Sequence, residues 1–523
     1  MKTGFYIDSK VMLGAKRVSA LLLTCLMTAL TACGGEANNQ QGGMESINDK
    51  NLSFNGTLAD ASDAFAQTPS EASPEATPQA ADTYNFEAAE LPQPYAEYLE
   101  VLMQIMENGT DPNGRQYDYN EAWNFENNRF AIEDVDRDGR PELIFNFNES
   151  YMADMCEVVY EYDEDTVTLR EELSAWVDTT YYSNGMVKEL MSHNHGRDPE
   201  PRGIWPYMLS EYDPETDSYR LLYYVESWDG CINSEDFPNE LDTDQDQLLY
   251  LITPGDEEVY AESEVMILNQ EEYDNWVKEI TPSWAEIHVA YRRMTKENIE
   301  NIRTGYAQAA AYALQADDWF MGEEYGPSVG DYLLYDMDRD GSLELITSIN
   351  QGTGRYSDNH FYGLAAGGKL TELPLVRLCD SVEKEWQADF DIGGNTQIDA
   401  YQDKDNIIFY EGNDYVREGI FGGYNETGFY YLKEGAVYQD SIRGSSEFFG
   451  NDGEDNEVHY YNMSDEEITE EQYEKIREDY VKDMEEIRVY QKWTYFSSEE
   501  ISEGELSEET IRLRLFESFL GSV

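Results

Sequence analysis

Two short acidic stretches of the sequence carry carboxylates at a spacing that suits metal binding. The first, DVDRDGRPELIF, runs from Asp134 to Phe145, and the second, DMDRDGSLELIT, runs from Asp336 to Thr347. Alternate carboxylates in a tightly turning loop converge on one centre, and a glycine permits the sharp turn. Because Ca²⁺ takes six to eight oxygen ligands, this density of carboxylates predicts a calcium-binding loop in each stretch.

The predicted ligands follow one pattern in both stretches, with side-chain oxygens at positions 1, 3, 5 and 9 and a backbone carbonyl at position 7. They are Asp134, Asp136, Asp138, Arg140 and Glu142 in the first stretch and Asp336, Asp338, Asp340, Ser342 and Glu344 in the second. Neither stretch is an EF-hand, because position 12 is Phe145 or Thr347, where an EF-hand has a bidentate glutamate. The alternative is an acidic turn whose aspartates accept hydrogen bonds from nearby amides and hold no ion.

The N-terminal residues predict export and a lipid anchor. Lys16 and Arg17 precede a short apolar run, Val18–Leu30, which is followed by small residues and Cys33. This arrangement predicts a secretory signal over residues 1–32, and the run is too short to span a membrane as a helix. The cysteine at the cut resembles the lipobox of bacterial lipoproteins. That resemblance implies that Cys33 becomes the acylated first residue, on the extracytoplasmic face of the cell membrane.

The rest of the chain predicts a tether followed by a duplicated fold. Residues 33–93 are rich in Gly, Asn, Gln, Pro, Ser and Ala, a composition that cannot bury enough apolar surface to fold. Beyond them, short segments recur in the same order as the acidic loops: EEYDNW and EQYEKI, EIHV and EIRV, MTKENI and LSEETI. We therefore expect an α+β fold with two homologous modules, 94–302 and 303–523. Each should be an antiparallel β meander with N-terminal and C-terminal helices.

The apolar segments that flank the first loop, RFAIE and ELIFNF, are typical of strands and place the loop at a hairpin tip. The loops resemble the D-x-D-x-D-G-x-x-D/E calcium loops of FG-GAP, or integrin-type, repeats. The resemblance covers about a dozen residues in each copy, so it implies the loop chemistry and not a propeller. The lipobox, the YYSNGMVKELMSHN run and the two loops together resemble uncharacterised two-module surface lipoproteins of Gram-positive gut bacteria. That family implies no particular activity.

Net charge limits the partners. The chain has 108 acidic and 35 basic residues, giving a formal charge of −73. Such a charge repels nucleic acid and anionic lipid headgroups, so the membrane contact is expected through the lipid alone. The cysteines that follow Cys33 are Cys156, Cys231 and Cys379, whose odd number and wide spacing indicate buried thiols with at most one bridge.

Catalytic motifs are scarce. The sequence has five histidines and no HExxH, GxSxG, P-loop or GxGxxG pattern. A third acidic run, LDTDQDQLL over 241–249, lacks the glycine and the position-9 acid and is expected to be a solvated turn. Aromatic clusters such as YYVESWDG over 223–230 either stack a sugar ligand or fill strand faces.

These observations favour a membrane-anchored extracytoplasmic lipoprotein with two structural calcium sites and a non-catalytic role in binding or display at the cell surface. The ligand, a glycan or a protein, stays open. The alternative is a hydrolase that acts on glycans or cell-wall material with paired carboxylates, a pair that 108 acidic residues do not single out.

Overall fold

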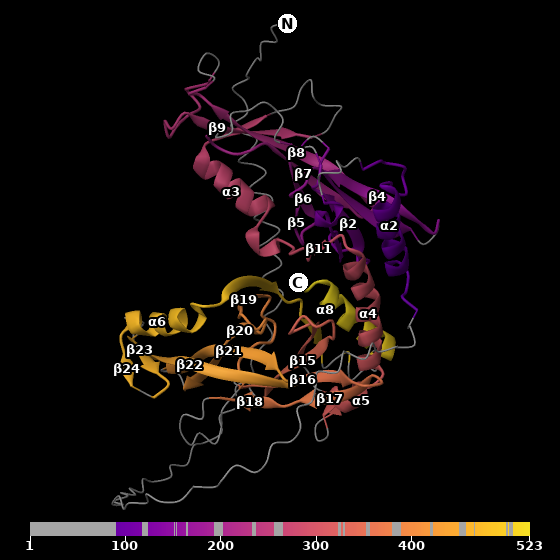
Figure 1. Ribbon diagram of the computed structural model, residues 1–523. Helices are drawn as coiled ribbons and strands as arrows, with labels where there is room; N and C mark the ends of the chain where they lie inside the picture. Colours follow the sequence, from indigo (N-terminus) through magenta and orange to yellow (C-terminus); the bar gives the residue numbers. More distant parts are fainter. Residues whose placement is uncertain are drawn as a thin grey trace, which may run out of the picture. The chain divides into compact units, whose positions relative to one another are not determined.

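Antiparallel β-sheets make up most of the described chain, and helices are few (Figure 1). The computed structural model describes residues 90–523 apart from 118–123, 151, 153, 164–165, 193–201, 233–236, 256–264, 323–325, 328–329, 352–355, 379–388, 419–421, 449–456, 465, 498–499 and 501–505. The expected signal segment lies outside the described residues, as does the expected tether except for 90–93. The fold is of mixed α/β class, which agrees with the predicted combination of helices and antiparallel meanders.

The first acidic stretch lies in a five-stranded sheet with the strand order β11-β1-β2-β3-β4. Its strands are β1 (Arg129–Glu133), β2 (Glu142–Phe147), β3 (Cys156–Asp163), β4 (Thr168–Ala175) and β11 (Arg292–Arg293), and the 3₁₀ helix η2 (Phe125–Asn127) precedes them. Helix α2 (Tyr95–Asn108) comes first and buries Tyr98, Leu102 and Ile105 on one face. It ends at Gly109, whose φ of 64° gives the left-handed cap that glycine favours.

A second sheet follows in the order β10-β9-β8-β7-β6-β5, with α3 packed against it (Figure 1). The elements are β5 (Thr180–Tyr181), β6 (Met186–Leu190), β7 (Tyr207–Asp213), β8 (Ser218–Asp229), β9 (Leu248–Pro254), β10 (Met266–Leu268), α3 (Gln270–Ile280) and η4 (Ser283–Ala285). Tyr273 of α3 stacks flat on Tyr250 of β9, with ring centroids 4.1 Å apart. This apolar contact fixes the helix on the sheet.

The second acidic stretch lies in another five-stranded sheet, ordered β17-β16-β15-β14-β26. The elements of this part are α4 (Lys296–Ala313), α5 (Ala316–Trp319), β12 (Met321–Gly322), β13 (Gly326–Pro327), β14 (Gly330–Tyr335), β15 (Glu344–Gln351), β16 (Tyr356–Ala365), β17 (Lys369–Leu373) and β26 (Thr494–Phe496). Strands β12 and β13 form a separate pair.

The last sheet has eight strands, seven of them in the order β24-β23-β22-β21-β20-β19-β25, while β18 pairs in parallel with β22. The elements are β18 (Leu375–Arg377), β19 (Gln397–Gln402), β20 (Ile408–Glu418), β21 (Gly422–Lys433), β22 (Ala436–Phe448), β23 (Glu457–Asn462), β24 (Glu467–Ile468), α6 (Glu470–Val481), β25 (Glu485–Tyr490) and α8 (Glu508–Leu520). Helix α6 stacks Tyr480 on Phe429 of β21, with ring centroids 4.8 Å apart.

The elements follow one another in a similar order in the two halves. Each half has a helix, a meander that holds the acidic hairpin, a second meander, another helix, a strand that returns to the edge of the first sheet, and a closing helix. The helix caps also match, since Asn269 and Thr469 each form a capping box and Thr295 and Ser507 each accept an amide hydrogen bond. Helix α4 closes the first series and opens the second, so the expected boundary between residues 302 and 303 falls inside it.

The largest apolar core gathers α2, α4 and α8 against strands of both five-stranded sheets. Phe516 of α8 contacts the rings of Tyr95 and Tyr306, each at a centroid distance of 5.1 Å. Aromatic burial of this kind stabilises by about 25 cal/mol for each Å² of apolar surface removed from water. The core therefore holds the strands that carry both acidic loops.

Candidate metal centres

Each predicted calcium loop lies at the tip of a hairpin, as expected from its flanking strands. Strands β1 and β2 pair antiparallel with Glu133 opposite Glu142. Strands β14 and β15 pair with Tyr335 opposite Glu344. The position-9 glutamate thus begins the returning strand in both hairpins, where its side chain is placed by the regular ladder and not by a flexible loop.

The backbone takes the same turn in the two loops. Positions 4 and 6 have left-handed conformations, with φ of 67° at Arg137 and 96° at Gly139, and of 58° at Arg339 and 90° at Gly341. A Cβ added at either glycine would meet no atom within 4 Å. Glycine is therefore favoured at position 6 of these two loops for its conformation and not for space.

A buried tyrosine from the preceding helix holds each loop from behind. The Tyr98 hydroxyl of α2 donates to the carbonyl of Pro141, and the Tyr312 hydroxyl of α4 donates to the carbonyl of Leu343, each at 2.6 Å. Both carbonyls are at position 8. Gln308 of α4 adds a further contact in the second loop, where its Oε1 accepts the Leu343 amide at 2.7 Å. Each loop is thus fixed to the helical core.

The first loop brings all four of its predicted carboxylates together. One oxygen from each lies within 4.8 Å of the others, and the residues are Asp134, Asp136, Asp138 and Glu142. The turn amides hold the outer oxygens, since Arg137 donates to Oδ1 of Asp134 and Val135 donates to Oε2 of Glu142, each at 2.7 Å. The carboxylates are therefore positioned before any ligand is present.

Two buried carboxylate oxygens in this loop have no hydrogen-bond partner. They are Oε1 of Glu142, a residue 0% exposed, and Oδ2 of Asp136, a residue 4% exposed. Burial raises the pKa of Asp136 to about 6 and that of Glu142 to about 11, and neighbouring carboxylates add to both shifts. A buried carboxylate oxygen that accepts no hydrogen bond is stabilised by a proton or by a cation. The donor set fits a hard divalent cation.

The second loop gathers three of its four carboxylates. Asp336, Asp338 and Glu344 place oxygens within 4.8 Å of one another, whereas Asp340 is not in the cluster and accepts the Ser342 amide at 2.7 Å. Burial raises the pKa of Asp336 to about 7 and that of Glu344 well above its ordinary value. The second loop repeats the position-9 contact, because the amide after position 1 donates to Oε2 of Glu344 at 2.9 Å.

Carboxylates from outside the motif lie beside the first loop. Asp136 forms a further cluster with Glu172 and Asp217, and Asp138 forms one with Glu161 and Asp217. Two arginines offset this charge. Arg170 Nη2 lies 2.9 Å from Oε1 of Glu172, and Arg140 Nε donates to Oδ2 of Asp138 at 2.7 Å. The side chain of Arg140, predicted only as a carbonyl ligand, thus neutralises part of the acidic cluster.

A third acidic cluster lies in the expected turn over 241–249, where Asp244 is exposed as a solvated turn predicts. Asp242, Asp244 and Asp246 place oxygens within 4.8 Å of one another, and Asp242 is buried. The run departs from the calcium-loop motif because Gln247 occupies the position of the glycine and Tyr250 the position of the ninth-position acid. The alternation of aspartates was the signal that could have found the cluster.

Polar concavities lie on two of the sheets among the described residues. A groove of about 650 Å³ lies over β19, β20 and β21 and is lined chiefly by carboxamides and carboxylates: Asn395, Gln397, Asp399, Glu411, Asn413 and Asn425. Arg477 of α6 holds two of them, with Nε donating to Glu411 at 2.9 Å and Nη2 to Asp399 at 3.1 Å. A smaller cavity, of about 380 Å³, is lined by Glu157, Asp178 and Tyr291 among others.

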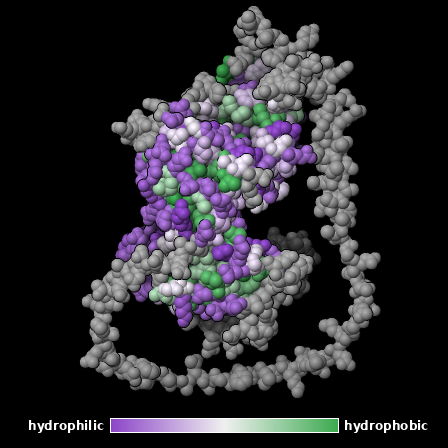
Figure 2. All heavy atoms as spheres, turned by 90° about the vertical axis from the view of Figure 1, so that its right-hand side faces the viewer, coloured by the Kyte–Doolittle hydropathy of each residue, from purple (hydrophilic) through white to green (hydrophobic). Residues whose placement is uncertain are grey.

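The aromatic run over 223–230 fills strand faces. Tyr223 packs edge-on against Trp276 at a centroid distance of 5.5 Å, and Trp228 packs against Phe237 at 5.9 Å. Hydrophilic residues occupy much of the described surface that faces the viewer in Figure 2, with small hydrophobic patches between them. No broad aromatic platform is present among the aromatic residues of this run.

The predictions for the cysteines have mixed outcomes. Cys33 and Cys379 lie outside the described residues. Cys156 is half-buried and Cys231 is exposed, and both are free thiols, so the expectation of buried thiols is wrong for Cys231.

Within the described part of the chain, no helix combines the length and apolarity needed to cross a membrane. Comparison of the sequence with protein-family models and with curated proteins finds no match.

Proposed function

We propose that this chain is a calcium-stabilised lipoprotein, anchored through Cys33 on the extracytoplasmic face of the membrane, with a non-catalytic role in binding or display. The observation that supports calcium is the matched pair of acidic hairpins. They share a backbone turn, a tyrosine contact from behind and a buried position-9 glutamate. The lipid anchor rests on the sequence around Cys33.

The ion would couple to folding through charge. Without it, crowded buried carboxylates repel one another or take up protons. With Ca²⁺ the same oxygens become ligands, so binding favours the folded state. Extracellular modules bind Ca²⁺ with dissociation constants of about 10⁻⁴–10⁻³ M. At a calcium concentration ten times such a constant, each site would add about 1.4 kcal/mol by RT ln(1 + [L]/Kd).

The two halves are, in this proposal, homologous modules over 94–302 and 303–523 that arose by duplication. The support is the repeated order of elements, together with the matching caps at Asn269 and Thr469 and at Thr295 and Ser507. Helix α4 would belong to both modules. Its first turn corresponds to the first turn of α8, which closes the second module, and its Tyr312 corresponds to Tyr98 of α2, which opens the first module. Each module would then carry one matched calcium hairpin.

The polar groove over β19–β21 is the proposed ligand site. Its carboxamides supply both donors and acceptors, while Asp399 and Glu411 add acceptors and are held in place by Arg477. Such a lining suits a ligand rich in hydroxyl groups, so a glycan fits it better than an anion does. The strongly negative chain also disfavours anionic ligands.

The hydrolase alternative has one observation in its favour, the cavity that contains Glu157 and Asp178. Burial raises the pKa of Glu157, as a general acid requires. Both of its oxygens are occupied, however, since Oε1 accepts from Tyr181 at 2.8 Å and Oε2 accepts from Asn146 and Tyr291, each at 2.7 Å. This arrangement is that of a structural carboxylate, and it favours binding over hydrolysis.

One experiment separates the two functions. The full chain, in detergent, is incubated with neutral cell-wall glycan fragments, and both retention and fragment length are measured. Binding predicts that fragments are retained intact and that Asn413→Ala, in the groove, weakens retention. Fragments that are shortened by the wild type but not by Glu157→Gln would support the hydrolase and contradict the proposal. Equal retention by the wild type and Asn413→Ala would remove the groove as the site.

A further inference from the structure

The connection between β8 and β9 contains an acidic loop that the D-x-D-x-D-G motif does not cover. Strand β8 ends at Asp229, β9 begins at Leu248, and Asp242, Asp244 and Asp246 lie just before β9. Oxygens from the three carboxylates lie within 4.8 Å of one another. Their spacing equals that of positions 1, 3 and 5 in the two predicted calcium loops.

The backbone of this third loop follows the other two. Its positions 4 and 6 are Gln245 and Gln247, and each has a φ of 63°, in the left-handed region where the other two loops have arginine and glycine. Glutamine enters this region at a steric cost that glycine avoids. The same turn therefore forms at all three places, although only two of them have the favourable residue at position 6.

The hydrogen bonds of the turn also match. The amide of Leu248, at position 7, donates to Oδ1 of Asp246 at 2.7 Å, as the position-7 amides of Arg140 and Ser342 do to their own position-5 aspartates. The amide of Gln247 donates to Oδ2 of Asp242 at 3.0 Å, as Gly341 does to Oδ2 of Asp336. The third loop thus orients its carboxylates as the second loop does.

An unsatisfied buried atom points independently to a ligand. Asp242 is only 9% exposed, and its Oδ1 is buried without a hydrogen-bond partner. Leaving a carboxylate oxygen in this condition is costly, and a bound cation relieves the cost. Because Oδ2 of Asp242 accepts the Gln247 amide, Oδ1 is the oxygen that remains available to a cation in the cluster.

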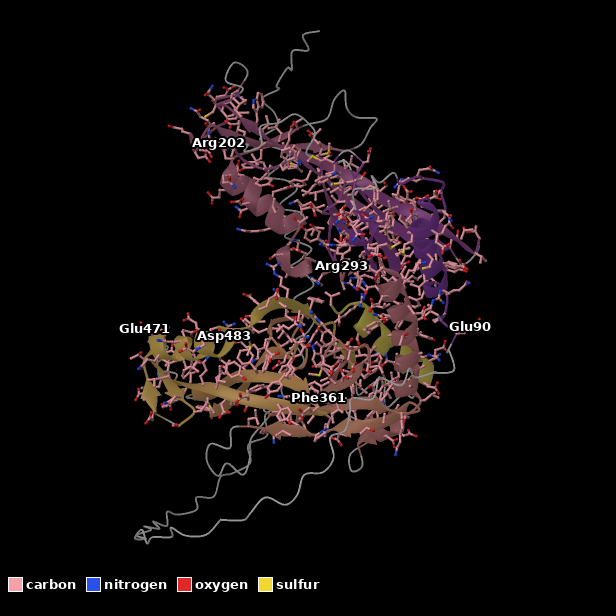
Figure 3. All side chains as sticks on the ribbon, in the orientation of Figure 1. Glu90, Arg202, Arg293, Phe361, Glu471 and Asp483 are labelled. Atoms are coloured by element: carbon pink, nitrogen blue, oxygen red, sulfur yellow. The ribbon has the colours of Figure 1, made fainter. Side chains whose placement is uncertain are left out.

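The nearby arginine does not neutralise the three carboxylates. Arg202, labelled in Figure 3, donates to the backbone carbonyl of Asp246 at 2.6 Å, and it lies 3.6 Å from Oδ1 of Asp229. Among the described residues, no lysine, arginine or histidine forms a salt bridge with Asp242, Asp244 or Asp246. The cluster therefore keeps most of its negative charge available for a metal ion.

We propose that Asp242, Asp244 and Asp246 bind a third hard divalent cation, Ca²⁺ in the extracytoplasmic setting. The inference extends, and rests on, the calcium chemistry proposed for the first two loops. Tyr250 stands where those loops have a glutamate, so the third site has one carboxylate fewer than the first and binds more weakly.

The third site would also fix the start of α3. The amide of Thr243, within the loop, donates to Oδ1 of Asn269 at 2.9 Å, and Nδ2 of Asn269 donates to the carbonyl of Leu241 at 3.1 Å. Asn269 is the N-cap of α3. An ion that orders the loop would thereby order the N-terminus of the helix that covers this sheet.

The test is the calcium stoichiometry of the full chain, measured by equilibrium dialysis with ⁴⁵Ca²⁺ at a salt concentration that suppresses diffuse binding. Asp244→Asn and Asp246→Asn remove ligand charge but keep the side-chain shape, and circular dichroism checks that each variant folds. Glu240→Gln removes a neighbouring exposed charge and serves as the matched control. The wild type and Glu240→Gln should bind three ions, and each loop variant should bind two.

Asp338→Asn, in the second loop, separates the two proposals. If Asp338→Asn loses one ion while Asp244→Asn and Asp246→Asn keep the wild-type number, the third site is overturned and the first two stand. If Asp338→Asn and Asp136→Asn, in the first loop, also keep the wild-type number, the calcium chemistry of the proposed function falls, and the third site falls with it. Loss of one ion in Glu240→Gln as well would mean that the loss reflects charge alone, and would overturn the third site.

Discussion

The amide of Val135 donates a 2.7 Å hydrogen bond to Oε2 of Glu142, while Oε1 of the same carboxylate is buried and has no partner. One oxygen of Glu142 thus stabilises the turn, and the other oxygen accepts no hydrogen bond and is available to a cation. Met337 and Glu344 repeat the first half of this relationship at 2.9 Å. The position-9 glutamate therefore connects the fold of each hairpin to its proposed ion.

The helix tyrosines behind the loops should contribute to stability. Tyr98→Phe or Tyr312→Phe removes the donor to a position-8 carbonyl, which is part-buried at Pro141 and buried at Leu343, and each change should cost about 1–3 kcal/mol of unfolding free energy. Tyr495→Phe, at a side chain that is 54% exposed, is the control and should change little. Urea titration followed by circular dichroism measures the three midpoints. Equal midpoints for all three variants would contradict the supporting role.

The glycines at position 6 should be needed for their backbone conformation. Gly139→Ala and Gly341→Ala force alanine to a φ of 96° or 90°, which should destabilise by about 1–2 kcal/mol even though no atom obstructs the new methyl group. Gly363→Ala is the control, because its Cβ would make ordinary contacts with Leu373 and no positive φ is involved. If Gly139→Ala and Gly341→Ala have the same melting temperature as Gly363→Ala, the backbone conformation at position 6 does not require glycine.

His360 should stabilise the folded chain in a pH-dependent manner. The carboxylate of Asp358, 3.6 Å from its Nε2, and that of Glu372, hydrogen-bonded to its Nδ1 at 2.9 Å, raise its pKa from 6.5 to about 9. Because the folded-state pKa is raised, the stabilisation is fully present below pH 6.5 and is lost as the pH rises through about 9. The side chain is 35% exposed, so solvent screening keeps the contribution small.

The measurement for His360 is an NMR titration of its ring, with His360→Gln to assign the signal. A midpoint near pH 9 is expected, whereas His288, whose pKa is lowered by burial, should titrate below its ordinary value. A His360 midpoint at or below 6.5 would show that the carboxylate contacts do not form in solution.

Cys33→Ala should abolish lipid attachment, because the thiol is the proposed acyl acceptor. The wild-type chain, expressed in a bacterial host and labelled with a radioactive fatty acid, should carry label and partition into detergent. Cys231→Ala, which removes an exposed thiol elsewhere, should behave as the wild type does. Label that persists in Cys33→Ala would refute the anchor.

The two hairpin loops could be predicted from the sequence because all the residues that define each loop are neighbours in the chain. Strand-forming residues flank each loop, and the aspartate spacing, the glycine and the position-9 acid all lie within one turn and the start of one strand. The carboxylates of Glu161, Glu172 and Asp217 were not predictable, because three different segments bring them beside Asp136 and Asp138. In a chain with 108 acidic residues, only the fold shows which distant carboxylates meet.

The third loop shows a different limit of sequence reasoning. A motif that demands glycine and glutamate rejects Gln247 and Tyr250, yet the backbone still adopts the turn around Asp242. The tyrosine contacts to the loops were also not predicted, because Tyr98 and Pro141 are 43 residues apart in the sequence and only the fold brings them together. The order of helices and strands was easier to predict from the sequence than these contacts, because similar helix starts and acidic loops recur at the same places in both halves.

Calcium titration of paired variants measures whether the two hairpins bind calcium. Isothermal titration compares the full wild-type chain with Asp136→Asn/Asp338→Asn, and with Asp405→Asn/Glu434→Gln as a control that removes two charges from exposed turns. If both hairpins bind calcium, the control should bind as the wild type does and the loop variant should lose two ions. The loop variant should also lose the calcium-dependent rise in melting temperature contributed by those sites. Equal stoichiometry in the wild type and the loop variant would mean that the two hairpins are acidic turns that hold no ion.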